Sequence, residues 1–489
     1  MEKLLILIFF AVLSLLLAAT GVSYRKKSKT LSGYIAADRS VSFFAGAFSS
    51  FSSVVCGFSV LVLMWGSYNE GARGARSAFL YGAALTVGLF FVWRFMGRRL
   101  RIYSELSSNT LTLPSFLESR FKDRSSVLKV VSSVVVIIFS SVYCSFLFTA
   151  AAQLLSAASG MSYSLALFMC AVIVSIYILF GGFSAEVFTD ILQGFIFFIV
   201  MFFLPVYMFD SLDAGSRFLF ENDFLSTLNF FENSEDLWVC IINSVFVFLG
   251  CFGLPSLFSR FIAMKDKKQI RRAKRLSAIP SAFCIVLVIV TGLFLRQFAV
   301  SETKDISVIL SQAIADPFMR ALVVSALLCA FMSSADSQIM LLSGIMGNDV
   351  YPLFRKDADD EERVTVARAA AVVMTFIVCL VSLDSSADIS ARFLYGFSGF
   401  AAAFAPVLFF SMYSRKITLR AAVASIISGT VCTFILWFIS FSPLGIFPGC
   451  VSLAVSAAVL CIVSAVDRKK PGREIINEFA RVNEIMKLR

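Results

Sequence analysis

Polar side chains cluster inside one of the most apolar segments of this sequence, between Ala321 and Met346. The run from Ala330 to Ser337 contains one carboxylate and three hydroxyls within five residues. In a helix, the first residue of that run and its three serines recur every three or four positions and share one face, and Asp336 lies beside it. Such groups are costly at membrane depth and usually face a cavity or a partner, so the run indicates part of an ion or solute pathway.

Each of these hydroxyls could instead bond to a carbonyl one turn earlier, as serines in membrane helices often do. That explanation suits one serine better than three serines with an aspartate. Two further carboxylates, Glu186 and Asp190, lie one helical turn apart on another segment. We expect a functional role for Asp190, whereas Glu186 is either a functional group or an interfacial charge. Asp336 is a Na+ ligand, a proton carrier or a packing acceptor.

The composition predicts the elements that hold these groups. Of 489 residues, 58% are hydrophobic and 15% are charged, against about 25% charged in soluble proteins. We therefore expect an all-α polytopic membrane protein without a separate soluble domain. Thirteen segments are long and apolar enough to span a membrane: Leu4 to Val22, Val41 to Trp65, Ala78 to Trp93, Val130 to Ser156, Leu165 to Phe180, Val187 to Met208, Trp238 to Phe258, Ala278 to Leu295, Ala321 to Met346, Ala369 to Leu383, Ile389 to Tyr413, Ala421 to Ile439 and Ile446 to Val466.

The basic residues are distributed unevenly among the loops that connect the predicted spans. The net charge is +11, but Lys and Arg collect in alternate loops, including eight basic residues between Arg260 and Arg275. The loop from Asp210 to Asp236 is acidic, with Arg217 its single basic residue. By the positive-inside rule, we expect a multi-pass plasma (inner) membrane protein with its N-terminus outside and the tail from Arg468 in the cytoplasm. Nucleic acid is not an expected partner.

Two predicted spans carry residues that interrupt helices. The second is rich in small and hydroxyl residues between Ser49 and Gly57, and the seventh contains two glycines and a proline between Gly250 and Pro255. The two segments are five spans apart, which is the spacing of a five-plus-five inverted repeat whose broken helices meet near the midplane. The alternative is that these residues merely let helices pack closely or kink.

The order and spacing of several short motifs give the chain a family resemblance. It resembles the sodium:solute symporter family and, within it, the sodium/proline symporter branch. The motifs are Asp38-Arg39-Ser40, Asn109 to Pro114, Tyr143-Cys144, Gly160 to Tyr163, Gly181 to Phe183 with Thr189-Asp190, Arg260-Phe261, Met332 to Gln338, and Tyr395 through Pro406.

The resemblance implies a LeuT-type inverted-repeat core with alternating access and a bound Na+ ion. It implies a core over residues 40–413, preceded by an accessory helix over 1–22 and followed by two helices over 414–466 and a cytoplasmic tail over 467–489. It implies a Na+ site made by the carbonyls of Ser52, Val55 and Ala330 and the hydroxyls of Ser333 and Ser334. A second Na+ site, present in some relatives, maps onto Asp190, Ser333, Asp336 and Ser337.

The departures from the family pattern concern the solute and the Na+ ion. The positions that the resemblance assigns to solute binding are Tyr143, Val247, Cys251, Leu254 and Pro255. Proline-type members have aromatic residues in place of Val247 and Cys251, and an aspartate in place of Val54. The loss of the two aromatic residues disfavours proline as the solute and leaves another small polar metabolite, such as an amino acid, sugar or carboxylate. The loss of the aspartate at Val54 bears instead on the strength of Na+ binding.

We therefore expect a Na+-coupled symporter whose partners are Na+, a small solute and the lipid bilayer, with no obligate protein partner evident. One alternative is proton coupling through Glu186, Asp190 or Asp336. Another is a non-transporting membrane sensor, which would need a separate signalling partner. An enzyme is not expected, because no pairing of nucleophile and base or metal-ligand spacing is visible, and the chain has no histidine.

Overall fold

The computed structural model describes residues 2–227, 234–265, 267, 269–298, 305–384, 389–440, 442, 445–468 and 471–487. Parts of the acidic loop and the tail residues Lys469 and Lys470 lie outside these ranges. Within them the protein is made of helices and loops, with one isolated bridge between Val41 and Met264. The predicted all-helical class is confirmed.

The α-helices are α1 (Glu2–Tyr24), α2 (Leu31–Ala36), α3 (Phe43–Phe51), α4 (Trp65–Glu70), α5 (Ala72–Val92), α6 (Arg98–Leu106), α7 (Leu113–Phe121), α8 (Val127–Ser159), α9 (Tyr163–Ser211), α10 (Ala214–Thr227), α11 (Ser234–Gly250), α12 (Pro255–Ala263), α13 (Ile270–Arg296), α14 (Ile306–Ala313), α15 (Pro317–Ile345), α16 (Tyr351–Phe354), α17 (Asp360–Val381), α18 (Ile389–Tyr413), α19 (Leu419–Phe438), α20 (Pro448–Val466) and α21 (Arg473–Lys487). Four π-helical segments cover Ser52–Cys56, Ser59–Met64, Trp93–Gly97 and Met346–Val350, and three 3₁₀ turns cover Arg25–Ser28, Ala37–Arg39 and Cys251–Gly253.

In the described part, eleven helices are long and apolar enough to cross a membrane, and α11 with α12 forms one bent pair. Helix α9 has 49 residues, about twice the length that a bilayer requires, and covers the fifth and sixth predicted spans. It kinks at Gly182, where φ is 56° and ψ is −151°, a backbone region open mainly to glycine. The kink lies between the two predicted spans, but the count of thirteen remains a prediction.

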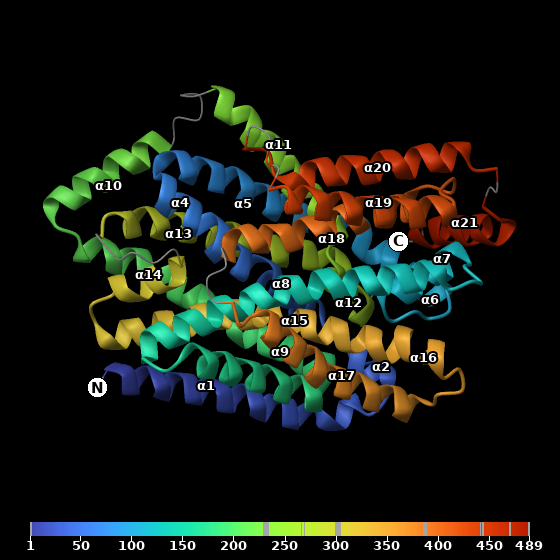
Figure 1. Ribbon diagram of the computed structural model, residues 1–489, viewed down its shortest axis with the longest axis horizontal. Coiled ribbons are helices and arrows are strands. Elements are labelled where there is room, and N and C mark those ends of the chain that lie inside the picture. The colour runs from blue at the N-terminus through green and yellow to red at the C-terminus, as the bar shows by residue number, and fades with distance from the viewer. Residues whose placement is uncertain are drawn as a thin grey trace.

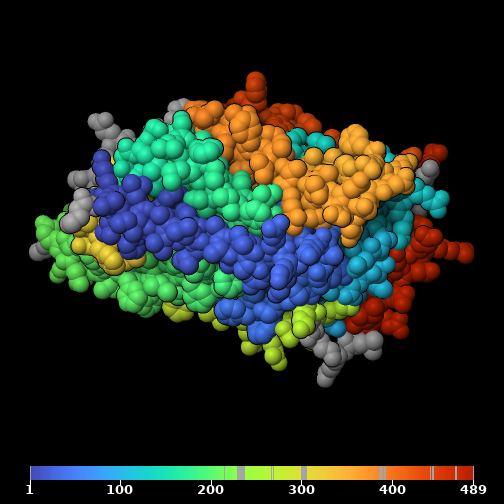
Figure 2. Space-filling view, turned by 90° about the horizontal axis from the view of Figure 1, so that it is seen from below, coloured from blue at the N-terminus to red at the C-terminus, as the bar shows by residue number. Residues whose placement is uncertain are grey.

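The long helices run roughly along the longest axis of the molecule, and the connections gather at its two ends (Figure 1). The start of α1 lies at the same end as α10 and α14, while α6, α7, α16 and α21 lie at the opposite end. The helices differ strongly in burial. The apolar window of the Phe43–Glu70 span is 94% buried inside the protein, against 28% for the Glu2–Ser28 span. Figure 2 shows α1 at the surface, where it packs lengthwise against α9.

The two predicted interruptions take different forms. The second span stays helical from Phe43 to Glu70 and widens into π-helix at Ser52–Cys56 and Ser59–Met64, so the prediction of a broken helix was wrong there. The seventh span is broken as predicted. After the 3₁₀ turn Cys251–Gly253, Leu254 is extended with φ −73° and ψ 114°, and α12 starts at Pro255 with a bend of 45°.

Candidate cation and solute site

The hydroxyl-rich run lies in the most enclosed part of α15, where every residue from Ala326 to Ile345 is buried. Helix α15 starts where the Asp316 carboxylate accepts a hydrogen bond from the Met319 amide and Pro317 occupies the first turn. The start of the helix sets the positions of the serines along it. The π-helical segment Ser52–Cys56 packs against α15. The two segments that were predicted to share a Na+ site are therefore neighbours.

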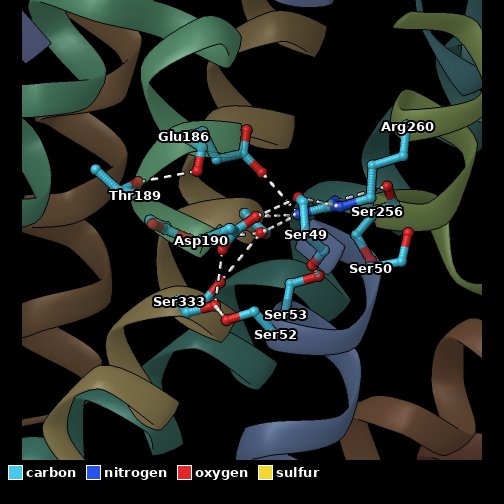
Figure 3. Close-up of polar contacts among 12 residues, drawn as sticks. Ser49, Ser50, Ser52, Ser53, Glu186, Thr189, Asp190, Ser256, Arg260 and Ser333 are labelled. Atoms are coloured by element: carbon cyan, nitrogen blue, oxygen red, sulfur yellow. Dashed lines mark hydrogen bonds and ion pairs between the residues drawn. The ribbon is translucent and has the colours of Figure 1, made fainter. Parts of the chain in front are cut away.

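Ser333 connects these two segments. Its hydroxyl donates to Oδ1 of Asp190 at 2.7 Å, and its oxygen lies 2.6 Å from the Ser52 hydroxyl. Because a hydroxyl carries one proton, Ser52 is the donor to Ser333. Figure 3 shows the resulting line from Ser52 through Ser333 to Asp190. The predicted Na+ site thus touches the predicted second site at a single shared side chain.

Ser334 points toward the same π-helical region. Its hydroxyl bonds to the Ala330 carbonyl at 3.2 Å, which is the back-bonding that the sequence left open. A Cβ atom added at Gly57 would lie 2.8 Å from that hydroxyl, so the glycine makes room for it. Hydroxyl and carbonyl oxygens are the ligands that a hard cation prefers. Among the described residues, no group of three or more His, Cys, Asp or Glu side chains could hold a metal.

A buried arginine occupies the predicted second site. Arg260 of α12 is 1% exposed, and its Nη2 donates to Oδ2 of Asp190 at 2.9 Å, to Oε1 of Glu186 at 3.0 Å and to the Ser337 hydroxyl at 2.8 Å. Its Nε donates to the Ser49 hydroxyl at 2.9 Å. Figure 3 shows the guanidinium reaching from α12 to the two carboxylates of α9.

Asp336 lies at the edge of this cluster and has no direct contact with Arg260 among the contacts described for it. Oδ2 of Asp336 accepts a hydrogen bond of 2.8 Å from the buried Tyr177 hydroxyl, and Oδ1 lies 3.4 Å from the Ser337 hydroxyl. Of the four residues predicted for a second Na+ site, Asp190, Ser333 and Ser337 are brought together around Arg260. Asp336 is instead bonded to the other half of α9 through Tyr177, and its role stays a prediction.

Tyr143 and the 3₁₀ turn Cys251–Gly253 pack against α18 from two sides. Tyr143 of α8 packs on Gly396, and its ring centroid lies 4.6 Å from that of Phe393. A Cβ atom added at Gly250, just before the 3₁₀ turn, would meet Phe397, and one added at Gly253, the last residue of the turn, would meet the Phe400 carbonyl. The Cys251 thiol lies 3.3 Å from the Val247 carbonyl and faces α5 at Gly88. Val247, Leu254 and Pro255 are buried beside it.

Sequence reasoning missed three side chains of the site. Arg260 was counted with the basic residues of a cytoplasmic loop, although it also belongs to a motif of the family resemblance. Ser49, which donates to Asp190 at 2.5 Å, was part of the hydroxyl-rich second span but received no role. Tyr177 gave no signal, because a tyrosine in an apolar span is ordinary.

Comparisons with known proteins agree with this architecture. The model of the sodium:solute symporter family matches residues 34–429. A sodium/proline symporter of Staphylococcus aureus is 27% identical over 498 residues, covering 98% of this chain and 96% of the relative.

Two solved structures share the fold. A Na+-coupled sialic acid symporter in its substrate-bound outward-open state has a TM-score of 0.79 at 16% identity, covering 95% of this chain and 98% of the other. A closed nucleobase-cation-symport-1 family transporter with bromovinylhydantoin bound has a TM-score of 0.56 at 12% identity, covering 92% and 98%. Both structures support the predicted LeuT-type fold class. The chain belongs to the sodium:solute symporter family of membrane transporters, in which Na+ is the coupled ion and a small-molecule solute is the partner.

Proposed function

We propose that the protein takes up a small polar organic solute by alternating access, driven by inward movement of Na+. The observation that carries this proposal is the bridge made by Ser333, which joins the π-helical segment at Ser52 to the carboxylate of Asp190. Buried hydroxyls that link three helices in this way form a polar site deep in an apolar protein, where such groups mark an ion pathway.

The Na+ ion is held, in this proposal, by the carbonyls of Ser52, Val55 and Ala330 and the hydroxyls of Ser333 and Ser334. All five residues are buried and lie on two packed segments. Binding an ion there favours the conformation in which the segments stay together. Ion and solute then raise each other's affinity, because each selects the same state.

The solute site lies between Tyr143 and the break around Cys251 and Leu254. Support comes from the packing of both regions on α18. With Val247 and Cys251 in place of the aromatic residues of proline-type members, the wall lacks two rings, so a solute other than proline is expected. Amino acids, sugars and carboxylates are the classes to screen.

The orientation is proposed from charge. The connections with α6, α7 and the start of α13 carry dense clusters of basic residues, and α6 and α7 lie at the end opposite α10 and α14 (Figure 1). Basic loops face the cytoplasm. The start of α1 therefore faces outward and α21 faces the cytoplasm in the plasma (inner) membrane.

Solute uptake into proteoliposomes, with and without a Na+ gradient, tests the proposal. Accumulation of a screened solute is expected to follow the Na+ gradient, and accumulation that ignores it for every transported solute would refute the proposal. Ser333→Ala is expected to raise the Na+ concentration for half-maximal uptake at least tenfold, about 1.4 kcal/mol of binding free energy. The matched control is Ser325→Ala, because Ser325 lies on the same helix and its hydroxyl bonds only to the Ala321 carbonyl among the contacts described for it.

A further inference from the structure

The cluster around Arg260 holds a cation that is part of the chain. A guanidinium stays protonated in proteins, and this one is enclosed by two carboxylates and two hydroxyls with 1% exposure. A cavity of about 10 Å³ beside it is lined by Glu186, Ser337 and Arg260 among others. That volume is about the least that admits one water. The positive charge is therefore bound by protein groups.

The groups that would bind a second Na+ ion are already in use. Oδ1 of Asp190 accepts from Ser333, and Oδ2 accepts from both Ser49 and Arg260. The Ser337 hydroxyl accepts from Arg260 and bonds to the Ser333 carbonyl at 3.1 Å. A mobile cation could reach Asp190 and Ser337 together only after the guanidinium leaves.

The guanidinium is carried by a helix that starts at a break in the chain. Leu254 is extended and α12 departs at 45° from the helix before it, so the angle of α12 determines where Arg260 lies. The far end of α12 is tied to Val41, two residues before α3, since the Val41 amide donates to the Ala263 carbonyl at 3.1 Å and the Lys265 amide donates to the Val41 carbonyl at 2.9 Å. Arg260 thus moves together with the segment that leads into the Na+ site.

We propose that Arg260 is a tethered cation that occupies the second cation site, so that the protein binds one Na+ ion and not two. The inference rests on the proposed Na+ symport and determines its ion stoichiometry. Ser333 carries the coupling, because it touches both Ser52 in the Na+ site and Asp190 in the arginine cluster. If Arg260 moves away, the negative charge of Asp190 loses its partner. That favours the return of Arg260 unless another cation binds to Asp190.

Na+ titration of thermal stability tests the inference without a known solute. The full-length purified protein is used at constant ionic strength, with choline replacing Na+. At saturating ligand, stability rises with the logarithm of ligand concentration in proportion to the number of ions bound to the folded state. The wild type is expected to show the slope of one ion. Arg260→Gln, which keeps the first three side-chain carbons and a polar end but removes the charge, is expected to show twice that slope.

Two further variants locate the second ion. Arg260→Lys keeps a positive charge and is expected to retain the one-ion slope. Arg260→Gln combined with Asp190→Asn is expected to return to one ion, because the second site has lost its carboxylate. A one-ion slope in Arg260→Gln, or a two-ion slope in Arg260→Lys, would overturn the inference.

The wild-type titration keeps the inference testable if a variant fails to fold. A two-ion slope in the wild type refutes the tethered cation and leaves Na+ symport standing. A flat wild-type response to Na+, together with uptake that ignores a Na+ gradient, refutes the proposed function itself.

Discussion

The second and seventh spans contain similar small residues, yet the chain uses them differently. From Phe43 to Glu70 the helix continues through two π-helical segments. Between α11 and α12 the chain leaves the helix at Leu254 and turns by 45°. The first arrangement keeps backbone and hydroxyl oxygens near α15, whereas the second redirects a helix that carries a charge.

The difference follows from what approaches each glycine. At Gly57, the nearest atom to an added Cβ is the Ser334 hydroxyl oxygen, a side-chain end that can rotate. At Gly253, the nearest atoms are the Phe400 carbonyl oxygen and the Ala405 amide nitrogen, which belong to the backbone of α18. In the proposed function the second span positions ligands, whereas the break in the seventh span, called the hinge below, packs against the backbone of α18.

The largest loss of stability is expected from changes at the cluster where Arg260 of α12 is buried. Asp190→Ala removes one of the two carboxylates around Arg260, and breaking a buried ion pair costs about 3–5 kcal/mol because a charge loses its partner. Unfolding of the purified protein, measured with and without Na+, gives the loss. The control is Glu362→Ala, which removes the solvent-accessible, partly exposed pair with Arg355 and is expected to cost less than about 1 kcal/mol. Equal losses in the two variants would contradict the structural importance of the cluster.

Much of this comparison could be predicted from the sequence. Hydropathy locates the spans, because burying apolar residues in a bilayer constrains composition directly. The polar run on α15 and the hydroxyls of the second span were identified by type and spacing. Their contact through Ser52 and Ser333, 281 positions apart, followed from the family resemblance and not from spacing.

The sequence could not predict the partner of each carboxylate. Periodicity tells which face of a helix a residue occupies, but Asp336 meets Tyr177 and Asp190 meets Arg260 only through tertiary packing. Arg260 begins a basic stretch, so its sequence context is that of a cytoplasmic loop. Arg260 becomes buried because the chain bends at Leu254, before α12. The small residues of the second span also predicted a break, but the helix continues there.

A smaller loss of stability is expected from adding a methyl group at Gly253, in the hinge. In Gly253→Ala the new methyl group would lie 2.6 Å from the Phe400 carbonyl oxygen, so the backbone of α18 or of the 3₁₀ turn must shift. Overpacking of this kind costs about 1–3 kcal/mol, measurable by thermal unfolding. Gly66→Ala is the control, since the nearest atom to its added Cβ lies 3.6 Å away. An unchanged stability in Gly253→Ala would show that the hinge is loosely packed.

The corresponding change in the second span is expected to alter ion binding more than folding. In Gly57→Ala the methyl group displaces the Ser334 hydroxyl, and the Na+ concentration for half-maximal uptake is expected to rise about tenfold, or 1.4 kcal/mol. Stability without Na+ is expected to change by less than about 1 kcal/mol, because alanine is the better helix former.

Gly344→Ala is the control for this effect. It lies on α15, where an added Cβ would meet the Ile35 side chain at 3.2 Å, and Na+ dependence is expected to stay unchanged. If Gly57→Ala lowered stability while Gly253→Ala changed Na+ dependence, the roles of the two spans would be reversed.

The smallest effect is expected at the proline that follows the break. Pro255 occupies the first turn of α12, where its missing N–H group breaks no intrahelical bond. Pro255→Ala mainly gives the unfolded chain more freedom, which costs about 0.4–1 kcal/mol. Pro448→Ala is the matched control, because Pro448 has the same position in α20. Thermal unfolding should give similar losses for the two variants; a much larger loss at Pro255 would mean that the proline, and not the packing of Gly253 on α18, holds the hinge.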